Sequence, residues 1–187
     1  MPPAHTSNMQ KRRERALWIA ENVNRDLKRL MLYRAYREHE LERPHNLRRA
    51  KVIAYVLDHY PVVFDEDSRL VGRYATDPLA AAEKEEVAES GPLLWRFQKG
   101  LLFGPDSGGV GGHRTVDFEL LLQLGVGGIL RRIDERQGEL AFSGEADAEK
   151  AYFYEAARIC LRALLRFVDR YREALLAARD AAQDAEQ

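Results

Sequence analysis

The sequence predicts a mainly α-helical protein, an irregular multi-helix domain with one short strand. Two observations predict this class. Apolar residues recur at steps of three and four along most of the chain, which is the period of a helix with one buried face. Strand-like and helical segments do not alternate in the manner of βαβ units, so a parallel sheet is not expected.

Local signals place the helix boundaries. Pro44 and Pro61 each end a helix, because proline disfavours the helical state of the residue before it. Asn46 and Asp77 are suited to cap helix N-termini, and Gly125 is suited to a helix C-terminus. The expected helices cover residues 10–41, 47–60, 79–89, 93–103, 115–125, 126–138 and 145–180.

The segments outside these helices complete the expected organisation. Residues 69–74, Arg-Leu-Val-Gly-Arg-Tyr, have the strongest strand character in the chain. Residues 1–9 are expected to form a flexible tail, and the polar residues 181–187 a frayed one. One helical domain is therefore expected over residues 10–180, without an internal repeat.

Charge and composition exclude several classes of function. The 29 Lys and Arg residues are balanced by 30 Asp and Glu residues, without the basic excess typical of nucleic-acid-binding proteins. No stretch approaches the roughly 18 apolar residues of a membrane span, and the first residues do not resemble a secretory signal. The single cysteine, Cys160, excludes a disulfide within the chain. We therefore expect a cytoplasmic protein without nucleic-acid or membrane partners.

No group of residues forms a recognisable catalytic or metal-binding pattern. The glycine-rich residues 104–112 lack the Gly-Lys-Ser/Thr ending of a phosphate-binding loop. His39 and His45 are six positions apart with Pro44 between them, whereas two zinc ligands on one helical face need a spacing of four. Cys160 has small apolar neighbours one helical turn away, so we expect it to be buried rather than reactive.

Three segments, taken in order, resemble a known family. Residues 47–72 combine LRRAKVIAYVL with PVVFDED and RLVG, residues 112–129 contain GHRTVDF and LLQLGVGGI, and residues 153–171 contain FYEAA and RFVDRY. This order is similar to the opening of glycyl radical enzymes of the pyruvate formate-lyase and glycerol dehydratase type. Val116 and Phe118 stand where that family has proline and tyrosine.

The resemblance implies the N-terminal helical region that packs around the ten-stranded α/β barrel of these enzymes. It implies His113 as a substrate-binding residue. It carries over no catalytic residue, because the family's active-site cysteine loop and glycyl radical loop are not found in this sequence. The family's cofactor is a protein glycyl radical, installed by an S-adenosylmethionine iron–sulfur activating enzyme, and this chain itself is expected to hold no cofactor.

These implications lead to an expected function. We expect a truncated, split or degenerate segment of a formate C-acetyltransferase, dehydratase or lyase, catalytically incomplete alone. Its exposed helix faces are expected to meet a complementary barrel subunit or a second copy of the chain. The alternative is an independent helical interaction or regulatory module derived from the same family. An enzyme that acts alone by unrelated chemistry is a third possibility.

Overall fold

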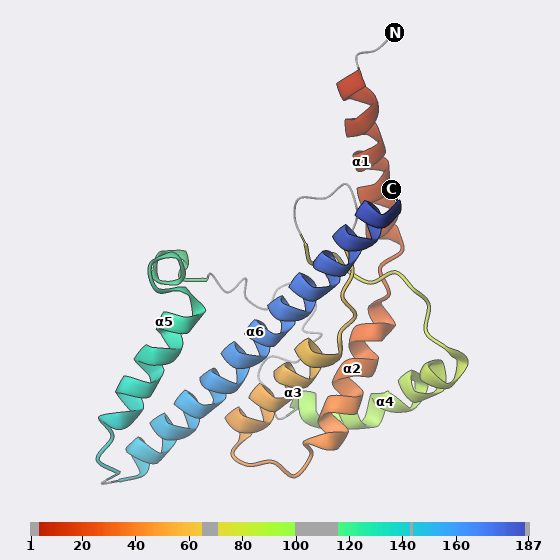
Figure 1. Cartoon of the computed structure of the whole chain (residues 1–187). Coiled ribbons are helices and arrows are strands. Elements are labelled where there is room, and N and C mark those ends of the chain that lie inside the picture. Colours follow the sequence, from red (N-terminus) through yellow and green to blue (C-terminus); the bar gives the residue numbers. More distant parts are fainter. Residues whose placement is uncertain (1–3, 65–70, 100–115, 143, 186–187) are drawn as a thin grey trace.

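The computed structural model describes residues 4–64, 71–99, 116–142 and 144–185, and within these ranges the chain forms six helices and no strand (Figure 1). The prediction of a mainly helical fold is confirmed. No helix in the described ranges combines the length and the apolar character that a membrane crossing requires. The helices are α1 (Ala4–Glu21), α2 (Arg25–Glu38), α3 (His45–His59), α4 (Ala81–Lys99), α5 (Phe118–Gly138) and α6 (Glu145–Ala185).

The long helix α6 organises the fold. It packs against α3 along one side and against α5 along another. Helix α2 lies on α3, and α4 lies on α2, so that the packed helices follow the spatial order α5, α6, α3, α2 and α4 (Figure 1). Helix α1 extends away from this group and packs on none of the other described helices. The core is therefore a series of helix–helix contacts and not one central cluster.

Helix α3 is apolar on two opposite faces because it lies between two helices. Val52 and Tyr55 pack toward α2, in a cluster with Tyr33 and Tyr36. The buried Ala50, together with Ala54, shares the other face with Asp58, which bonds to α6. Small side chains on that face allow the backbones of α3 and α6 to approach closely.

A second cluster joins α2 to α4. Leu30 is 0 % exposed and packs with Met31 of its own helix, with Val87 of α4, and with Leu79 of the segment that leads into α4. Tyr60, which follows α3, also packs against this cluster. The residues that connect α3 to α4 are thereby fixed to the start of α2.

The single helix expected over residues 10–41 is divided in the structure. Helix α1 begins at Ala4, within the segment expected as a tail, and ends at Glu21. Asn24 then caps α2, because its side chain accepts a hydrogen bond from the backbone N–H of Leu27 at 3.0 Å. Its backbone N–H donates to the carbonyl of Ala75 at 2.9 Å. Asn24 therefore starts a new helix and holds the α3–α4 connection beside it.

The two helices expected at 79–89 and 93–103 are instead one continuous helix over its described length, α4, which begins at Ala81 and contains Pro92. Proline removes one backbone hydrogen bond and normally ends or kinks a helix. Leu94 is 5 % exposed and packs in the cluster with Tyr33 and Tyr36, so the residues after Pro92 bury apolar surface by continuing the helix. Tertiary packing thus overrides the local signal at Gly91-Pro92.

The other expected helix starts lie within a few residues of the observed ones, but the N-cap predicted at Asn46 is wrong, because α3 begins at His45 with Pro44 at the N-cap position. Asp117 caps α5 by accepting from the N–H of Leu120 at 2.9 Å, and Gly125 interrupts α5 with φ 60° and ψ 175°. The predicted division at Gly125 is therefore confirmed. Helix α6 begins at Glu145 as expected and continues to Ala185, beyond the predicted end at Asp180.

The strand expected over residues 69–74 is not formed in its described part. Residues 71–74 have no regular secondary structure, and residues 69 and 70 lie outside the described ranges. A strand requires a neighbouring strand to satisfy its backbone hydrogen bonds, and the described ranges contain no strand that could pair with it. Gly72 has φ +94°, which departs from the extended conformation of a strand.

Candidate functional site

Four arginines are spaced four residues apart along α6, at positions 158, 162, 166 and 170. Each step of four residues rotates the side-chain direction by about 40° around the helix axis. The first arginine of the row therefore faces α5, and the last two face α3. Three of the four bond to neighbouring helices or to the residues that follow them. The row therefore joins α6 to both of its neighbours.

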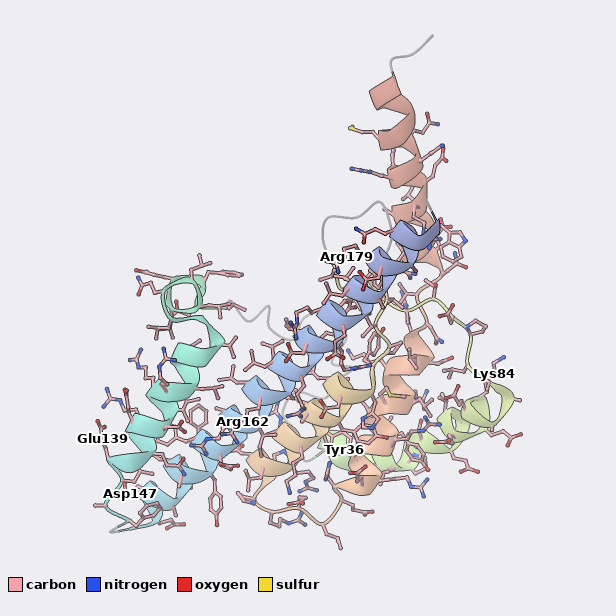
Figure 2. The ribbon with its side chains drawn as sticks, viewed as in Figure 1. Tyr36, Lys84, Glu139, Asp147, Arg162 and Arg179 are labelled. Atoms are coloured by element: carbon pink, nitrogen blue, oxygen red, sulfur yellow. The ribbon has the colours of Figure 1, made fainter. Side chains whose placement is uncertain are left out.

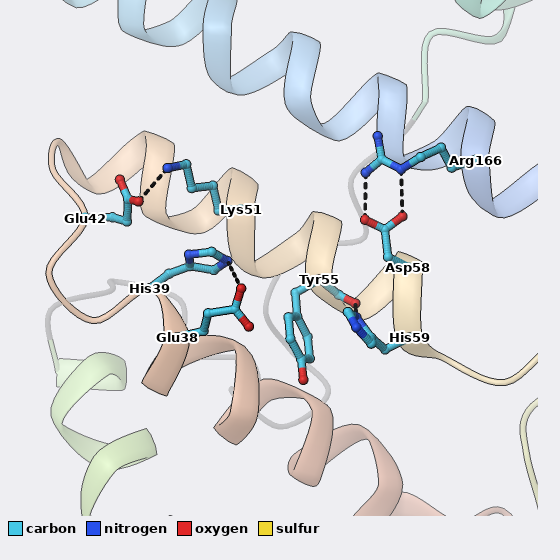
Figure 3. Close-up of polar contacts among 8 residues, drawn as sticks. All are labelled: Glu38, His39, Glu42, Lys51, Tyr55, Asp58, His59 and Arg166. Atoms are coloured by element: carbon cyan, nitrogen blue, oxygen red, sulfur yellow. Dashed lines mark hydrogen bonds and ion pairs between the residues drawn. The ribbon is translucent and has the colours of Figure 1, made fainter.

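On the α3 side, Arg166 forms two hydrogen bonds with the carboxylate of Asp58, at 2.9 and 2.7 Å (Figure 3). This bidentate pair raises the pKa of Arg166. Arg170 donates to the carbonyls of Leu57 and Tyr60, at 2.8 and 2.9 Å. These carbonyls belong to the end of α3, where backbone acceptors lack partners within the helix. Arg170 is therefore a side-chain cap for α3, supplied by α6.

On the α5 side, Arg158 donates to Asp134 at 2.7 Å and to Glu155 and Gln137. Its side chain is only 12 % exposed, so the charge is held between the two helices. The hydrogen bond to Asp134 raises the pKa of Arg158. Arg162 is exposed and has no ion-pair partner in the part of the chain that the structure describes.

The polar groups around α2 and α3 have structural partners. Lys51 pairs with Glu42 at 2.5 Å, and this hydrogen bond lowers the pKa of Glu42 (Figure 3). His39 Nε2 lies 3.8 Å from a carboxylate oxygen of Glu38. His59 stacks on Tyr55 with ring centroids 4.0 Å apart. Across the described ranges, no three His, Cys, Asp or Glu residues are grouped so that they could hold a metal ion.

Cys160 lies in the middle of α6 and is half-buried. Burial raises the pKa of its thiol, because the apolar surroundings disfavour the thiolate. A thiol with a raised pKa is a weak nucleophile at neutral pH. This agrees with the packing role expected from the sequence, and it does not fit the cysteine of a catalytic loop.

A groove of about 620 Å³ separates the start of α3 from the start of α6. It is lined by His45 on one side and by aromatic residues, including Tyr152 and Phe153, on the other. The Nε2 atom of His45 is buried and has no hydrogen-bond partner among the described residues. Burial lowers the pKa of His45, and the neighbouring positive charge of Arg48 lowers it further. The groove therefore presents a neutral imidazole next to aromatic surface.

The lowered pKa of His45 makes stability depend on pH. The neutral imidazole is favoured in the folded state, so the unfolded chain binds more protons below the ordinary histidine pKa of about 6.5. This contribution to stability is complete above pH about 6.5 and is lost as the pH falls through the lowered pKa of folded His45. His45→Gln should lose less stability than the wild type between pH 7.5 and 5.5, measured by urea unfolding. Equal losses in the wild type and in His45→Gln would contradict the assignment.

His113, the residue expected to contact substrate, lies outside the described residues. Its substrate-binding role therefore stays a prediction. The aromatic groove and the arginine row are features that the sequence pattern did not single out. The signal for the row was present as arginines at every fourth position, but their partners Asp58 and Asp134 lie far away in the sequence.

One comparison with known proteins finds a similarity, and it covers α5 and α6. The model of the pyruvate formate lyase-like family matches residues 98–187, slightly less than half of the chain. We call these residues the pyruvate formate-lyase-like region after this match. No curated protein and no solved structure matches the chain.

The pyruvate formate-lyase-like region contains two of the three segments that carried the resemblance, at 112–129 and 153–171. The first segment, at 47–72, precedes it and includes most of α3. Helix α3 nevertheless packs on α6 and receives the bonds of Arg166 and Arg170. The matched region is thus held in place by a helix from outside it.

The structure shows where the cysteine and the Val-Gly-Arg-Tyr sequence lie. The cysteine of this chain is a half-buried residue within a helix. Gly72, in the Val-Gly-Arg-Tyr sequence, lies in the segment between α3 and α4. Cys160 thus lies within a long helix, and Gly72 lies in a segment without regular secondary structure.

Proposed function

We propose that this chain is a helical scaffold segment of a pyruvate formate-lyase-like glycyl radical enzyme, and that it is catalytically incomplete by itself. The family match over residues 98–187 carries the proposal. It is supported by the nature of the polar contacts, since the arginines of α6 bond to neighbouring helices and to the end of α3. Such contacts orient helices and do not activate a substrate.

On this proposal, the lyase, acyltransferase or dehydratase chemistry of the family depends on another polypeptide. The glycyl radical, installed by an S-adenosylmethionine iron–sulfur activating enzyme, would supply hydrogen-atom abstraction there. This chain would contribute helices that support the barrel, with His113 as a contact to substrate. A cytoplasmic location belongs to the same proposal, since a chain with one cysteine suits a reducing compartment.

Radical activation tests this proposal. The purified chain is incubated without oxygen with S-adenosylmethionine and a reduced activating enzyme, and protein radicals are measured by electron paramagnetic resonance. A complete glycyl radical enzyme, activated in parallel, is the positive control. We expect no radical on this chain, and a radical in a mixture only when a polypeptide with the cysteine and glycine loops is added. A protein radical formed on this chain alone would contradict the proposal.

A second candidate function is an independent helical interaction module derived from the family. The observation that favours it is the apolar surface on α6, where Leu164, Val168 and Leu175 are 37 %, 54 % and 39 % exposed. Exposed apolar residues that continue along one helix indicate a binding surface. A protein that binds this surface can be sought by affinity purification of the chain. If the same bound protein is recovered with and without a radical-bearing subunit, the interaction module is favoured over the scaffold.

A further inference from the structure

The apolar stripe of α5 continues with an unchanged helical period across the bend at Gly125. Before the bend it contains Phe118 and Leu122, which are 63 % and 84 % exposed. After the bend, the same steps of three and four reach three half-buried residues, Val126, Ile129 and Ile133. Among the described helices, only α6 packs on α5. The bend therefore divides one apolar stripe into an exposed part and a part that lies against α6.

The face of α6 toward α5 also continues beyond the present contact. Arg158 and the half-buried Leu161 lie on this face. Leu165 and Val168 continue it at steps of four and three, and they are 37 % and 54 % exposed. Both helices thus carry exposed apolar residues directly after the point where their contact ends.

Two glycines permit the bend. Gly125 has a φ of +60°, in the left-handed region that residues with a Cβ atom disfavour. A Cβ atom added to the buried Gly128 would lie 2.8 Å from the Cβ of Leu124, which belongs to the part of α5 before the bend. In a straight helix, residues four apart have Cβ atoms about 5–6 Å apart, so a side chain fits there. The bent form therefore requires glycine at both positions, and a straight form does not.

A straight α5 would place Leu122 against Val168. The two helices run antiparallel (Figure 1), and Asp134 accepts a hydrogen bond from Arg158 at 2.7 Å. Leu122 lies twelve residues before Asp134, and Arg170 lies twelve residues after Arg158. Helical side chains point toward the helix N-terminus, so Arg158 contacts α5 at a level before its own backbone. Leu122 would therefore meet the turn of α6 that ends at Arg170 and contains Val168.

Closing this contact combines straightening at Gly125 with a tilt of α5 toward α6. The two helices lie close together near Glu139 and Asp147 and separate toward Arg179 (Figure 2). The bonds of Arg158 join the helices near their close end. These bonds can therefore persist while the far ends approach.

We propose that residues 118–124 form a strap that swings about Gly125 and closes over the face of α6 around Val168. The bent form is the open state, in which Leu120 and Leu121 of the strap are half-buried. The closed state buries the opposite side of the strap, so each state has its own apolar contacts. Closure covers Val168 and reduces the apolar surface that α6 presents. The proposal does not depend on the chain being part of a radical enzyme.

Disulfide trapping tests the closed state. In a Cys160→Ala chain, the pair Leu122→Cys and Val168→Cys should oxidise to an intramolecular disulfide, because closure brings the two positions within bonding distance. The matched control is Leu124→Cys with Val168→Cys, since Leu124 lies on the opposite side of the strap from Leu122. Mass spectrometry and non-reducing electrophoresis at low protein concentration identify the product. A Leu122 pair that oxidises no faster than the control pair would overturn the proposal.

Alanine substitutions at the glycines test the bend. Gly125→Ala should raise the rate of the Leu122 disulfide by about fivefold or more, because alanine disfavours the left-handed conformation of the open state. Gly128→Ala should also raise it. The control is Gly127→Ala, whose added Cβ would have Arg131 as its nearest neighbour at 3.9 Å and would not contact the strap. Circular dichroism checks that the helices persist. Rates for both variants equal to that of Gly127→Ala would contradict the proposal.

Discussion

Leu30→Ala is expected to lower the free energy of unfolding by about 2–5 kcal/mol, the range for removing a buried leucine side chain. Leu30 is 0 % exposed and packs against Leu79 and Val87, so its loss leaves a cavity where α2, α4 and the preceding connection meet. The surrounding residues belong to different elements, which limits how far they can collapse into the space. Urea unfolding, followed by circular dichroism at 222 nm, measures the change.

A leucine-to-alanine substitution at an exposed position is the matched control, because it removes the same atoms without creating a cavity. Leu41 follows α2 and is 89 % exposed. Leu41→Ala should change the free energy of unfolding by no more than about 0.5 kcal/mol. Equal effects of the two substitutions would mean that the cluster around Leu30 does not carry the stability assigned to it.

Ala163→Leu is expected to cost about 1–3 kcal/mol, because it inserts a larger side chain into a closely packed contact. Ala163 is 0 % exposed and lies on the face of α6 that meets Ala50 and Ala54 of α3. A leucine there forces the two helices apart and lengthens the bonds from Arg166 and Arg170 to α3. The measurement is again urea unfolding.

The control for this substitution lies on the same helix. Ala177 is exposed, so Ala177→Leu adds the same atoms to α6 without entering a helix–helix contact. Its effect on the free energy of unfolding should be within about 0.5 kcal/mol of zero. A loss at position 177 as large as at 163 would point to the helix itself and not to the contact with α3.

The helices of the second half were largely predictable because their signals are local. Asp117 supplies its own N-cap bond, and Gly125 adopts a positive φ that few other residues accept. The first half was harder. The helical apolar pattern continues across Asn22 and Asn24, which hides the break between α1 and α2. Pro92 indicates a helix end that the burial of Leu94 overrides.

The sites were less predictable than the helices, because their geometry depends on distant residues. Ala50 and Ala54, which face α6, lie on the opposite side of α3 from Val52 and Tyr55, which face α2. In a helix that is buried on two sides, the apolar residues do not fall on one face, so periodicity does not define a single buried face. The partners of Arg166 and Arg170 lie more than a hundred residues away, so periodicity alone could not identify them.

The central claim is that α3, which lies outside the pyruvate formate-lyase-like region, holds α6 of that region in place. Native-state hydrogen exchange of the full chain tests this most directly, because it measures the opening free energy of each segment. Amides of α6 at residues 156–171 should open with the same free energy as those of α3, and residues 175–185 should exchange faster. An α6 that stays protected over residues 156–171 while α3 exchanges freely would contradict the claim.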